Sequence, residues 1–402
     1  MTPAIAEQST FPVSDIDPFS KEYLSDPYPY HEQLREAGPI VWLRKWDCWA
    51  TGRHKEMNDV LADPLLFCSS AGIGIANFNN AKPWRPPSLL LESDPPEHTR
   101  RRAVVGKVLS AGNLRRLKAD FEVAAEALVE RILEKKQLDA VRDIAEPYIL
   151  KVFPDAVGVG ESGREKLIPY GSAVFNAFGP ENDIYRESMR GIEPVSEWIM
   201  SNCSRENLRP GGLGSEIYDA VDSGEVPIDE APILVRSFLS AGIDTTVHSI
   251  GNALWCFATH PDQWKKLRAN QGLVRSAFLE VVRFESPFQT YFRTSTRDTS
   301  IADVPIANNQ KIFVSAGAAN RDPRRWDRPN SFDIERQNLG HMGFGAGIHG
   351  CIGQMIARLE TEVLFTAMAR RIASIEISGP ATYRLNNVLR GFDSLPVTVA
   401  AQ

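Results

Sequence analysis

The residues best suited to chemistry form a short glycine-rich run around Cys351. Three glycines precede this cysteine from position 345 onward, and Gly353 follows it. Glycines let a backbone bend sharply and lie close to a flat partner. From Ile352, apolar residues recur at three- and four-residue intervals, which predicts a helix with one buried face. The pattern therefore places a thiol at a helix N-terminus, where the helix dipole is expected to lower its pKa and favour the thiolate.

An anionic sulfur in such a loop is either a metal ligand or a nucleophile. A nucleophile needs a base and an orienting carboxylate, and His349 is the nearby base without an obvious third member. A zinc site needs further Cys or His at short spacing, whereas the other cysteines are scattered singly at positions 48, 68, 203 and 256. A single axial thiolate ligand to haem needs neither of these additions.

The cysteine run resembles the haem-binding signature of the cytochrome P450 superfamily. The matching identities are Phe344, Gly347, His349, Cys351 and Gly353. The resemblance implies that Cys351 is the proximal ligand of iron in haem b and that Phe344 belongs to the haem-binding set. A buried, inert cysteine before a helix is the competing interpretation.

A second segment lies in the middle of a long predicted helix. Asp229 is a good N-cap, Pro232 suits the first turn, and the helical pattern continues to His260, which predicts a rod of about 45 Å. At its centre stands Ala-Gly-Ile-Asp-Thr-Thr, in which the small pair beside an acid and a hydroxyl predicts a local bulge and a pocket. The Thr245 hydroxyl could simply bond the carbonyl four residues back. The segment resembles the oxygen-activation motif of the same superfamily, which implies that Asp244 relays protons and Thr245 stabilises the activated oxygen.

Basic residues elsewhere resemble the superfamily's haem-propionate ligands. His98 and Arg102 lie four apart on a helix that begins after Asp-Pro-Pro, and the resemblance assigns them to the propionates together with Arg293 and His349. The neighbouring arginines 100 and 101 would then meet an acidic electron donor. A solvated basic surface is the alternative.

Glu280 and Arg283 match the superfamily's Glu-x-x-Arg, which implies a buried structural pair behind the cysteine loop, although a surface pair is the simpler interpretation. The usual third partner is an arginine in a Pro-x-Arg-Phe segment. Here Ser331 occupies that position, so the completion of the network stays open.

The substrate is inferred from two further resemblances, both to bacterial monooxygenases of para-substituted benzoates. The loop 82–88 and the run 236–240 match theirs. On the helix, Ser237 and Ser240 lie about 12 and 7.5 Å from Thr245 along the axis, which brackets a benzoate with a small para group. The residues expected to bind this substrate are Arg85, Ser88, Phe175, Phe178, Ser237, Ser240 and Tyr291. Arg85 would supply charge, Ser88 and Ser237 would hold the carboxylate, the phenylalanines would pack the ring, and Tyr291 stands where a phenylalanine is expected. A terpenoid or fatty-acid pocket is the alternative.

Composition and hydrophobic pattern predict the domain organisation and the fold class that position these residues. The chain has 402 residues, a net charge of −6 and no dividing linker, which predicts one domain over 15–402 after a mobile N-terminus at 1–14. Helical patterns dominate, with expected helices at 29–37 and 54–61, a hairpin at 40–43 and 48–51, and a strand at 311–315. The expected fold class is mainly α with a small β region, the cytochrome P450 fold, with its long central helix over a haem held by the cysteine loop.

Five scattered cysteines and the absence of any sufficiently long apolar run predict a cytosolic protein that crosses no membrane, and the acidic balance gives no case for nucleic acid. We expect a monomer. With no flavin or nicotinamide domain recognised, electrons are expected from an iron–sulfur ferredoxin and an NAD(P)H-dependent reductase. A haem-based gas sensor or carrier and a haem-free helical binding protein are the alternatives from other classes.

Overall fold

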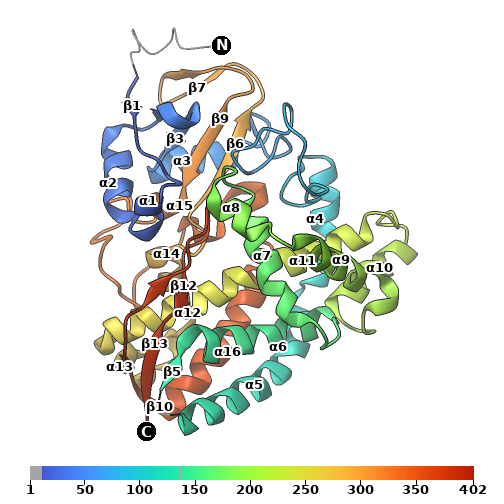
Figure 1. The fold of residues 1–402 in the computed structure, drawn as a ribbon, viewed down its shortest axis with the longest axis vertical. Coiled ribbons are helices and arrows are strands. Elements are labelled where there is room, and N and C mark those ends of the chain that lie inside the picture. The colour runs from blue at the N-terminus through green and yellow to red at the C-terminus, as the bar shows by residue number, and fades with distance from the viewer. Residues whose placement is uncertain (1–10, 136) are drawn as a thin grey trace.

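A computed structural model describes residues 11–135 and 137–402 of the chain. It is mostly helical with a small β region, which confirms the predicted fold class (Figure 1). The α-helices are α1 Lys21–Ser25, α2 Tyr28–Ala37, α3 His54–Ala62, α4 Glu97–Val108, α5 Ala111–Glu134, α6 Glu146–Val157, α7 Leu167–Asn176, α8 Asp183–Ser188, α9 Ile192–Asn202, α10 Leu213–Asp222, α11 Ala231–Ala241, α12 Asp244–Thr259, α13 Pro261–Ala269, α14 Val274–Glu285, α15 Ala316–Ala319 and α16 Gln354–Arg371.

The strands form one larger sheet and three small ones. They are β1 Val13–Ser14, β2 Val41–Leu43, β3 Cys48–Thr51, β4 Phe67–Cys68, β5 Leu138–Asp139, β6 Thr290–Ser295, β7 Thr299–Ile301, β8 Val304–Ile306, β9 Lys311–Ser315, β10 Ile372–Ile377, β11 Thr382–Tyr383, β12 Phe392–Ser394 and β13 Pro396–Ala401. The six-stranded sheet has the order β1-β2-β3-β9-β6-β4 and stands at one end of the molecule, while β10 and β13 lie at the other end (Figure 1).

The predicted hairpin and the strand at 311–315 are both present. β2 and β3 pair antiparallel, and β9 pairs with β3 on one side and with β6 on the other. All six residues of β6 are buried. Because side chains alternate along a strand, Tyr291 and Arg293 share one face of β6, and both line the cavity described below.

The end of the N-terminal stretch expected to be mobile is instead part of the sheet. Val13 and Ser14 pair in parallel with Trp42 and Leu43, and the Trp42 amide donates to the Pro12 carbonyl over 2.9 Å. These hydrogen bonds fix residues 12–14, because an edge strand of the sheet is available to them. Residues 1–10 of the predicted mobile segment lie outside the described residues.

The long central rod predicted from one continuous pattern is two helices. α11 ends at Ala241 and α12 begins at Asp244, and a methyl group at Gly242 would lie 2.2 Å from a ring carbon of Phe153. The Thr245 and Thr246 hydroxyls donate to the carbonyls of Ala241 (2.7 Å) and Gly242 (3.1 Å), which would otherwise accept backbone amides. The interruption stands where the local bulge was expected, but it ends one helix and begins the next.

The start of α11 also differs from the prediction. The residue at its N-cap is Glu230 rather than Asp229, and the Glu230 side chain makes no capping hydrogen bond. The Glu230 carboxylate is instead held by arginines 100 and 101 of α4, at 2.9 and 2.6 Å. An ion pair across two helices thus replaces the local cap.

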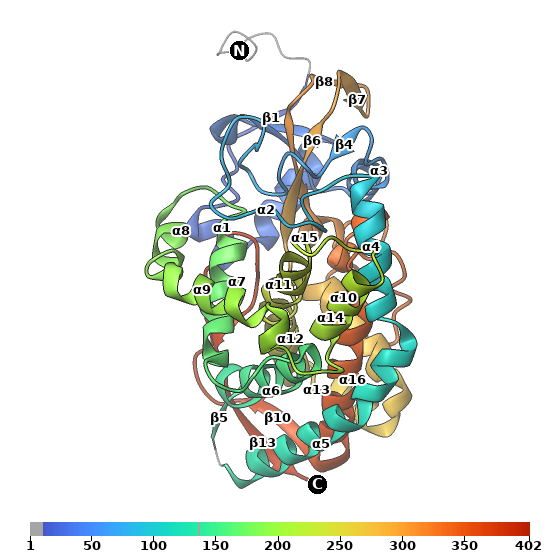
Figure 2. The same cartoon turned by 90° about the vertical axis from the view of Figure 1, so that its right-hand side faces the viewer.

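The helical body surrounds α12 and α16. α5 packs along α16, while α14 contacts both α12 and α16. α4 and α5 run down one side of this body, and α7 to α9 lie on the opposite side (Figure 2). This arrangement brings the cysteine loop before α16 and the α11–α12 junction to the same interior space.

Candidate active site

A cavity of about 230 Å³ lies between the cysteine loop and the α11–α12 junction. Its wall is mostly apolar, and it brings together residues from distant parts of the chain. The predicted site residues that line it are Ser88, Arg102, Phe175, Phe178, Ser237, Ser240, Thr245, Tyr291, Arg293, Phe344, His349 and Cys351. Arg85, His98 and Asp244 stand outside this lining set. The structure therefore gathers most of the predicted residues around one space.

The cysteine loop presents Cys351 to the cavity as the glycine pattern predicts. The Cys351 amide donates to the Phe344 carbonyl over 2.7 Å, which closes the loop. Gly345 and Gly347 have φ angles of 68° and 65°, and a methyl group at Gly347 would lie 2.1 Å from the Leu61 carbonyl oxygen. Only glycine fits at position 347, so the loop lies tightly against α3.

The prediction of a lowered Cys351 pKa is wrong for the polypeptide alone. Burial raises the pKa of this thiol, while backbone hydrogen bonds from Gly353 and Gln354 and the charge of Arg102 oppose the rise. Burial outweighs the helix terminus because the sulfur is shielded from water. A bound metal ion would reverse this balance, since coordination deprotonates a thiol.

Four basic residues gather at or beside the cavity, and only His349 has an acidic neighbour among the described residues, Asp94 at 3.9 Å. Arg102 donates to the Gly350 carbonyl (2.5 Å) and Arg293 to the Phe292 carbonyl (2.9 Å), and neither forms an ion pair within the described part of the chain. The His98 and His349 rings lie 4.2 Å apart, and their ring nitrogens have no hydrogen-bond partner among residues 11–135 and 137–402. Buried donors without acceptors are costly. This cluster fits a bound group that carries carboxylates, as haem does.

Asp244 is buried beside the cavity rather than in its lining. It is 2% exposed, and its two carboxylate oxygens have no partner within the described ranges. Burial raises its pKa to about 7, with Arg384 opposing and Glu146 adding to the rise. Thr245 faces the cavity with its hydroxyl bonded to a helix carbonyl, which is the simpler alternative foreseen for it. An acid with a pKa near neutrality can both hold and release a proton.

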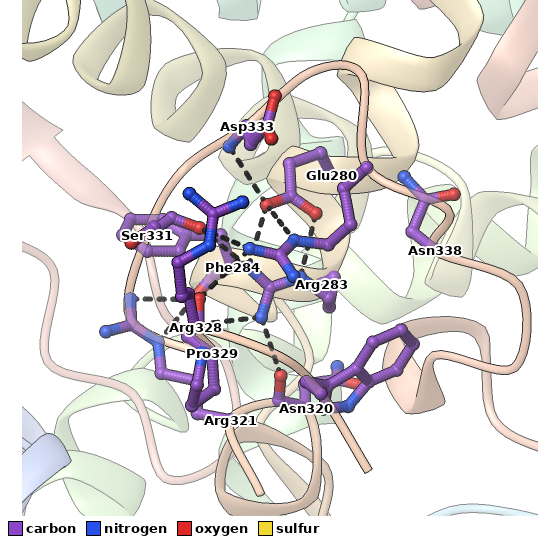
Figure 3. Close-up of polar contacts among 12 residues, drawn as sticks. Glu280, Arg283, Phe284, Asn320, Arg321, Arg328, Pro329, Ser331, Asp333 and Asn338 are labelled. Atoms are coloured by element: carbon purple, nitrogen blue, oxygen red, sulfur yellow. Dashed lines mark hydrogen bonds and ion pairs between the residues drawn. The ribbon is translucent and has the colours of Figure 1, made fainter. Parts of the chain in front are cut away.

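The Glu280–Arg283 pair is buried, and its third partner is Arg336. Arg283 donates to the two Glu280 oxygens over 2.8 and 2.7 Å, and both side chains are fully buried (Figure 3). Arg336 donates to Glu280 Oε1 over 3.1 Å. Ser331 contributes only its backbone carbonyl, at 3.2 Å from Arg283. Sequence reasoning missed Arg336, although it is the only Lys or Arg between positions 329 and 341.

Arg85 does not line the cavity, contrary to the expectation that it faces the substrate. It pairs with Glu92 at 3.4 Å, and Glu92 also accepts the backbone amide of Ser88 at 2.6 Å. Arg236 was missed as a site residue. It is 3% exposed and donates to the Pro86 carbonyl over 2.8 Å, and Arg85 donates to the same carbonyl over 2.9 Å, so the two guanidinium groups lie close together.

An aromatic wall forms another side of the cavity. Phe175 meets Phe178 edge to face at 5.9 Å and Phe288 at 5.7 Å, and Phe288 stacks on Tyr291 at 5.5 Å. Phe288 was not foreseen. Such a wall suits a flat, apolar ligand.

The basic face predicted around arginines 100 and 101 is partly neutralised. Both arginines pair with Glu230, and Arg100 also pairs with Glu97 at 3.1 Å. Their positive charges are therefore less available to an acidic partner than the sequence suggested.

Comparison with known proteins identifies the family. Residues 215–373 match the family described as Cytochrome P450. The chain is 52% identical over 383 residues to Cytochrome p450 CYP199A2 of Rhodopseudomonas palustris, covering 95% of this chain and 93% of that protein. The chain belongs to the cytochrome P450 family. It is also 28% identical over 395 residues to Linalool 8-monooxygenase of Pseudomonas putida, which covers 93% of this chain and 95% of that enzyme.

Solved P450 structures share the fold. The structure of cytochrome P450 CYP109Q5 from Chondromyces apiculatus superposes with a TM-score of 0.81 at 27% identity, covering 96% of this chain and 98% of the other. P450BioI in complex with an acyl carrier protein ligated to hexadec-9Z-enoic acid gives a TM-score of 0.83 at 25% identity, covering 94% and 99%.

The family assignment confirms the predicted enzyme class and cofactor. The chain is a P450 monooxygenase that binds haem b through a cysteine thiolate. Among the described helices, none is long and apolar enough to cross a membrane.

Proposed function

We propose that this P450 inserts one oxygen atom of O2 into a small aromatic carboxylic acid. The substrate class is a para-substituted benzoate, oxidised by O-demethylation or hydroxylation of the para group. The observation that carries the proposal is an apolar cavity with serine hydroxyls near a buried, net positive pair of arginines. The 52% identity to CYP199A2 over nearly the whole chain supports a common bacterial P450 architecture for this pocket.

The charge balance behind Ser88 favours an anion. Arg85 and Arg236 carry two formal positive charges, and Glu92 is the one carboxylate ion-paired to either in the described structure, which leaves a net charge of +1. A buried charge without a counter-ion is costly, so a carboxylate nearby is stabilised. The Ser88 and Ser237 hydroxyls line the cavity and would hold the carboxylate, while Arg85 and Arg236 act through their field.

The aromatic side of the cavity fits the ring and the para group of such a substrate. Phe175 and Phe178 would pack the aromatic ring, and Ser240 lies one turn from Asp244 on the way to the reacting end. The Tyr291 ring would limit the size of the para group. A neutral terpenoid would leave the net positive charge unmatched. A fatty acid would match that charge but would give the aromatic wall no flat ring to pack against, so both are weaker alternatives.

The haem-binding residues are assigned from the cysteine loop and from the side-chain donors that have no acceptor among the described residues. Cys351 would supply the thiolate, Phe344 would pack beside the haem, and the propionates would take the unpaired donors of His98, Arg102, Arg293 and His349. Thiolate-ligated haem, when bound, favours O–O cleavage and supplies an oxidant able to attack a C–H bond.

Asp244 and Thr245 would deliver protons to the cavity. The Asp244 carboxyl, with its pKa raised by burial to about 7, would hold a proton at an oxygen atom and pass it toward the cavity. The Thr245 hydroxyl stands at the cavity wall, where it would position the proton acceptor. Electrons would come from an iron–sulfur ferredoxin and its NAD(P)H-dependent reductase.

Spectral titration tests the carboxylate anchor. We expect 4-methoxybenzoate to bind the holoenzyme at least tenfold more tightly than its methyl ester, because one charge-assisted hydrogen bond contributes about 1.5 to 3 kcal/mol. Ser237→Ala should reduce this preference. Ser249→Ala is the matched control, since Ser249 also lines the cavity and donates to a helix carbonyl, that of Thr245 at 2.6 Å, but lies twelve positions from Ser237. Equal binding of acid and ester in all three proteins would refute the proposal.

A further inference from the structure

The Tyr291 hydroxyl is a buried donor that the site as described does not use. Tyr291 is 6% exposed and lines the cavity, and its hydroxyl has no hydrogen-bond partner among the described residues. Burial raises its pKa, so the hydroxyl stays protonated at neutral pH. A buried hydroxyl without an acceptor is costly, which indicates that a bound group accepts its hydrogen bond.

The position of this hydroxyl is fixed by three neighbours. The Phe288 ring stacks on Tyr291 with an interplanar angle of 10°, which holds the ring on its apolar side. A methyl group placed on Gly345 would lie 3.4 Å from the Tyr291 hydroxyl oxygen, so the hydroxyl reaches the start of the cysteine loop. On the same face of β6, the Arg293 guanidinium carbon lies 5.4 Å from the centre of the Tyr291 ring.

These contacts place the unpartnered Tyr291 hydroxyl and the Arg293 guanidinium, which donates only to the Phe292 carbonyl among the described residues, on the same face of β6. Arg293 has no carboxylate partner in the described structure, and Tyr291 is the only other β6 residue among those that line the cavity. The two side chains leave the strand in the same direction, two residues apart. One carboxylate next to the cysteine loop would satisfy both.

We propose that Tyr291 is a further haem-binding residue, whose hydroxyl donates a hydrogen bond to the propionate carboxylate that pairs with Arg293. The inference rests on the proposed function in placing a propionate at Arg293, and it does not depend on the substrate class. The shared chemistry is a buried oxygen acceptor, and an oxygen in the para group of a substrate is the other source of it. The experiment separates the two sources.

Haem release gives the first readout, and it needs no turnover. Tyr291→Phe keeps the ring and removes only the hydroxyl. We expect haem transfer from the holoenzyme to excess apomyoglobin to become about tenfold faster, because a hydrogen bond to a charged group is lost. Tyr218→Phe is the matched control: the hydroxyl of this buried tyrosine donates to the Cys203 carbonyl over 2.7 Å and lies outside the cavity lining, so haem release should not change.

A double variant gives a second readout. If Tyr291 and Arg293 hold the same propionate, the effects of Tyr291→Phe and Arg293→Lys on haem release should not add, since contacting residues couple. Strict additivity would contradict a shared carboxylate.

Substrate binding gives the last readout. Tyr291→Phe should leave the relative affinity for 4-methoxybenzoate and 4-ethylbenzoate unchanged, because the variant keeps the ring and the lost hydroxyl is bonded to the propionate. These two acids differ in the para oxygen, so a hydroxyl bonded to the substrate would show as a lost preference for the methoxy acid. Unchanged haem release with a reduced preference for the methoxy acid would assign the hydroxyl to substrate, and no change in either measurement would assign it to neither. Both results overturn the proposal. Failure of the benzoate proposal would show instead as equal acid and ester binding, whatever residue stands at position 291.

Discussion

Loss of Arg336 should destabilise the protein although this residue is not among those that line the cavity. Arg336 donates to Glu280 Oε1 (3.1 Å) and to the backbone carbonyls of Asp327 (2.5 Å), Arg328 (3.0 Å) and Ser331 (3.1 Å). Glu280 is fully buried and holds α14 to the segment that leads into the cysteine loop, where it also accepts the Asp333 amide at 3.2 Å. Arg336→Ala removes all four donations at once.

The size of the expected loss of stability follows from the hydrogen bonds that Glu280 retains in Arg336→Ala. Glu280 keeps its two hydrogen bonds from Arg283, so its charge stays partly compensated, but three carbonyls lose a donor. Breaking a buried ion pair costs about 3 to 5 kcal/mol, and the remaining Arg283 partner places the expected loss at about 3 kcal/mol. The cysteine loop follows this segment, so the fraction of protein with the thiolate-type carbon monoxide spectrum should also fall on mild heating.

Urea unfolding of the holoenzyme measures the effect, with Ser331→Ala as the matched control. Ser331 occupies the position where the third arginine was expected, but only its backbone carbonyl takes part in the network, and alanine retains that carbonyl. Ser331→Ala should therefore stay within about 0.5 kcal/mol of the parent protein. If Arg336→Ala were as stable as Ser331→Ala, Arg336 would not complete the network.

Four further outcomes are expected. Cys351→Ala should abolish the thiolate-type carbon monoxide spectrum, and its persistence would contradict the ligand assignment. Thr245→Ala should consume reducing equivalents with more hydrogen peroxide and less product, so parent-like coupling would count against the oxygen site at the helix junction. The Asp244 carboxyl has a pKa of about 7 in the folded protein, whereas in the unfolded chain it loses its proton near pH 4. The free energy of unfolding of the parent protein should therefore fall from pH 4 to 7, and that of Asp244→Asn should fall less. Urea unfolding across this pH range measures the difference. Glu230→Gln should free two arginines of α4 and speed reduction by an acidic ferredoxin at low salt only; a gain that persists at high salt would contradict electrostatic steering.

The sequence by itself determined the local features of the site. The cysteine loop follows from glycines whose positive φ angles and close approach to α3 no other residue allows, and α16 follows from the apolar period after it. The β2–β3 hairpin and β9 were predicted within a residue or two, because their turn residues and apolar runs act over short distances. The basic residues that we propose for the haem propionates also came from motifs that stand alone in the sequence.

Only the tertiary structure decided which partners these residues meet. Arg336 reaches Glu280 across 56 positions, and Arg236 reaches the Pro86 carbonyl across 150, so no local pattern announced either contact. The rod predicted from 229 to 260 divides at Gly242, where the Phe153 ring leaves no room for a side chain and the Thr245 and Thr246 hydroxyls bond two of the helix carbonyls. Burial likewise reversed the expected pKa shift of Cys351, since the field at a helix terminus is readable from sequence but desolvation depends on the whole fold around the sulfur.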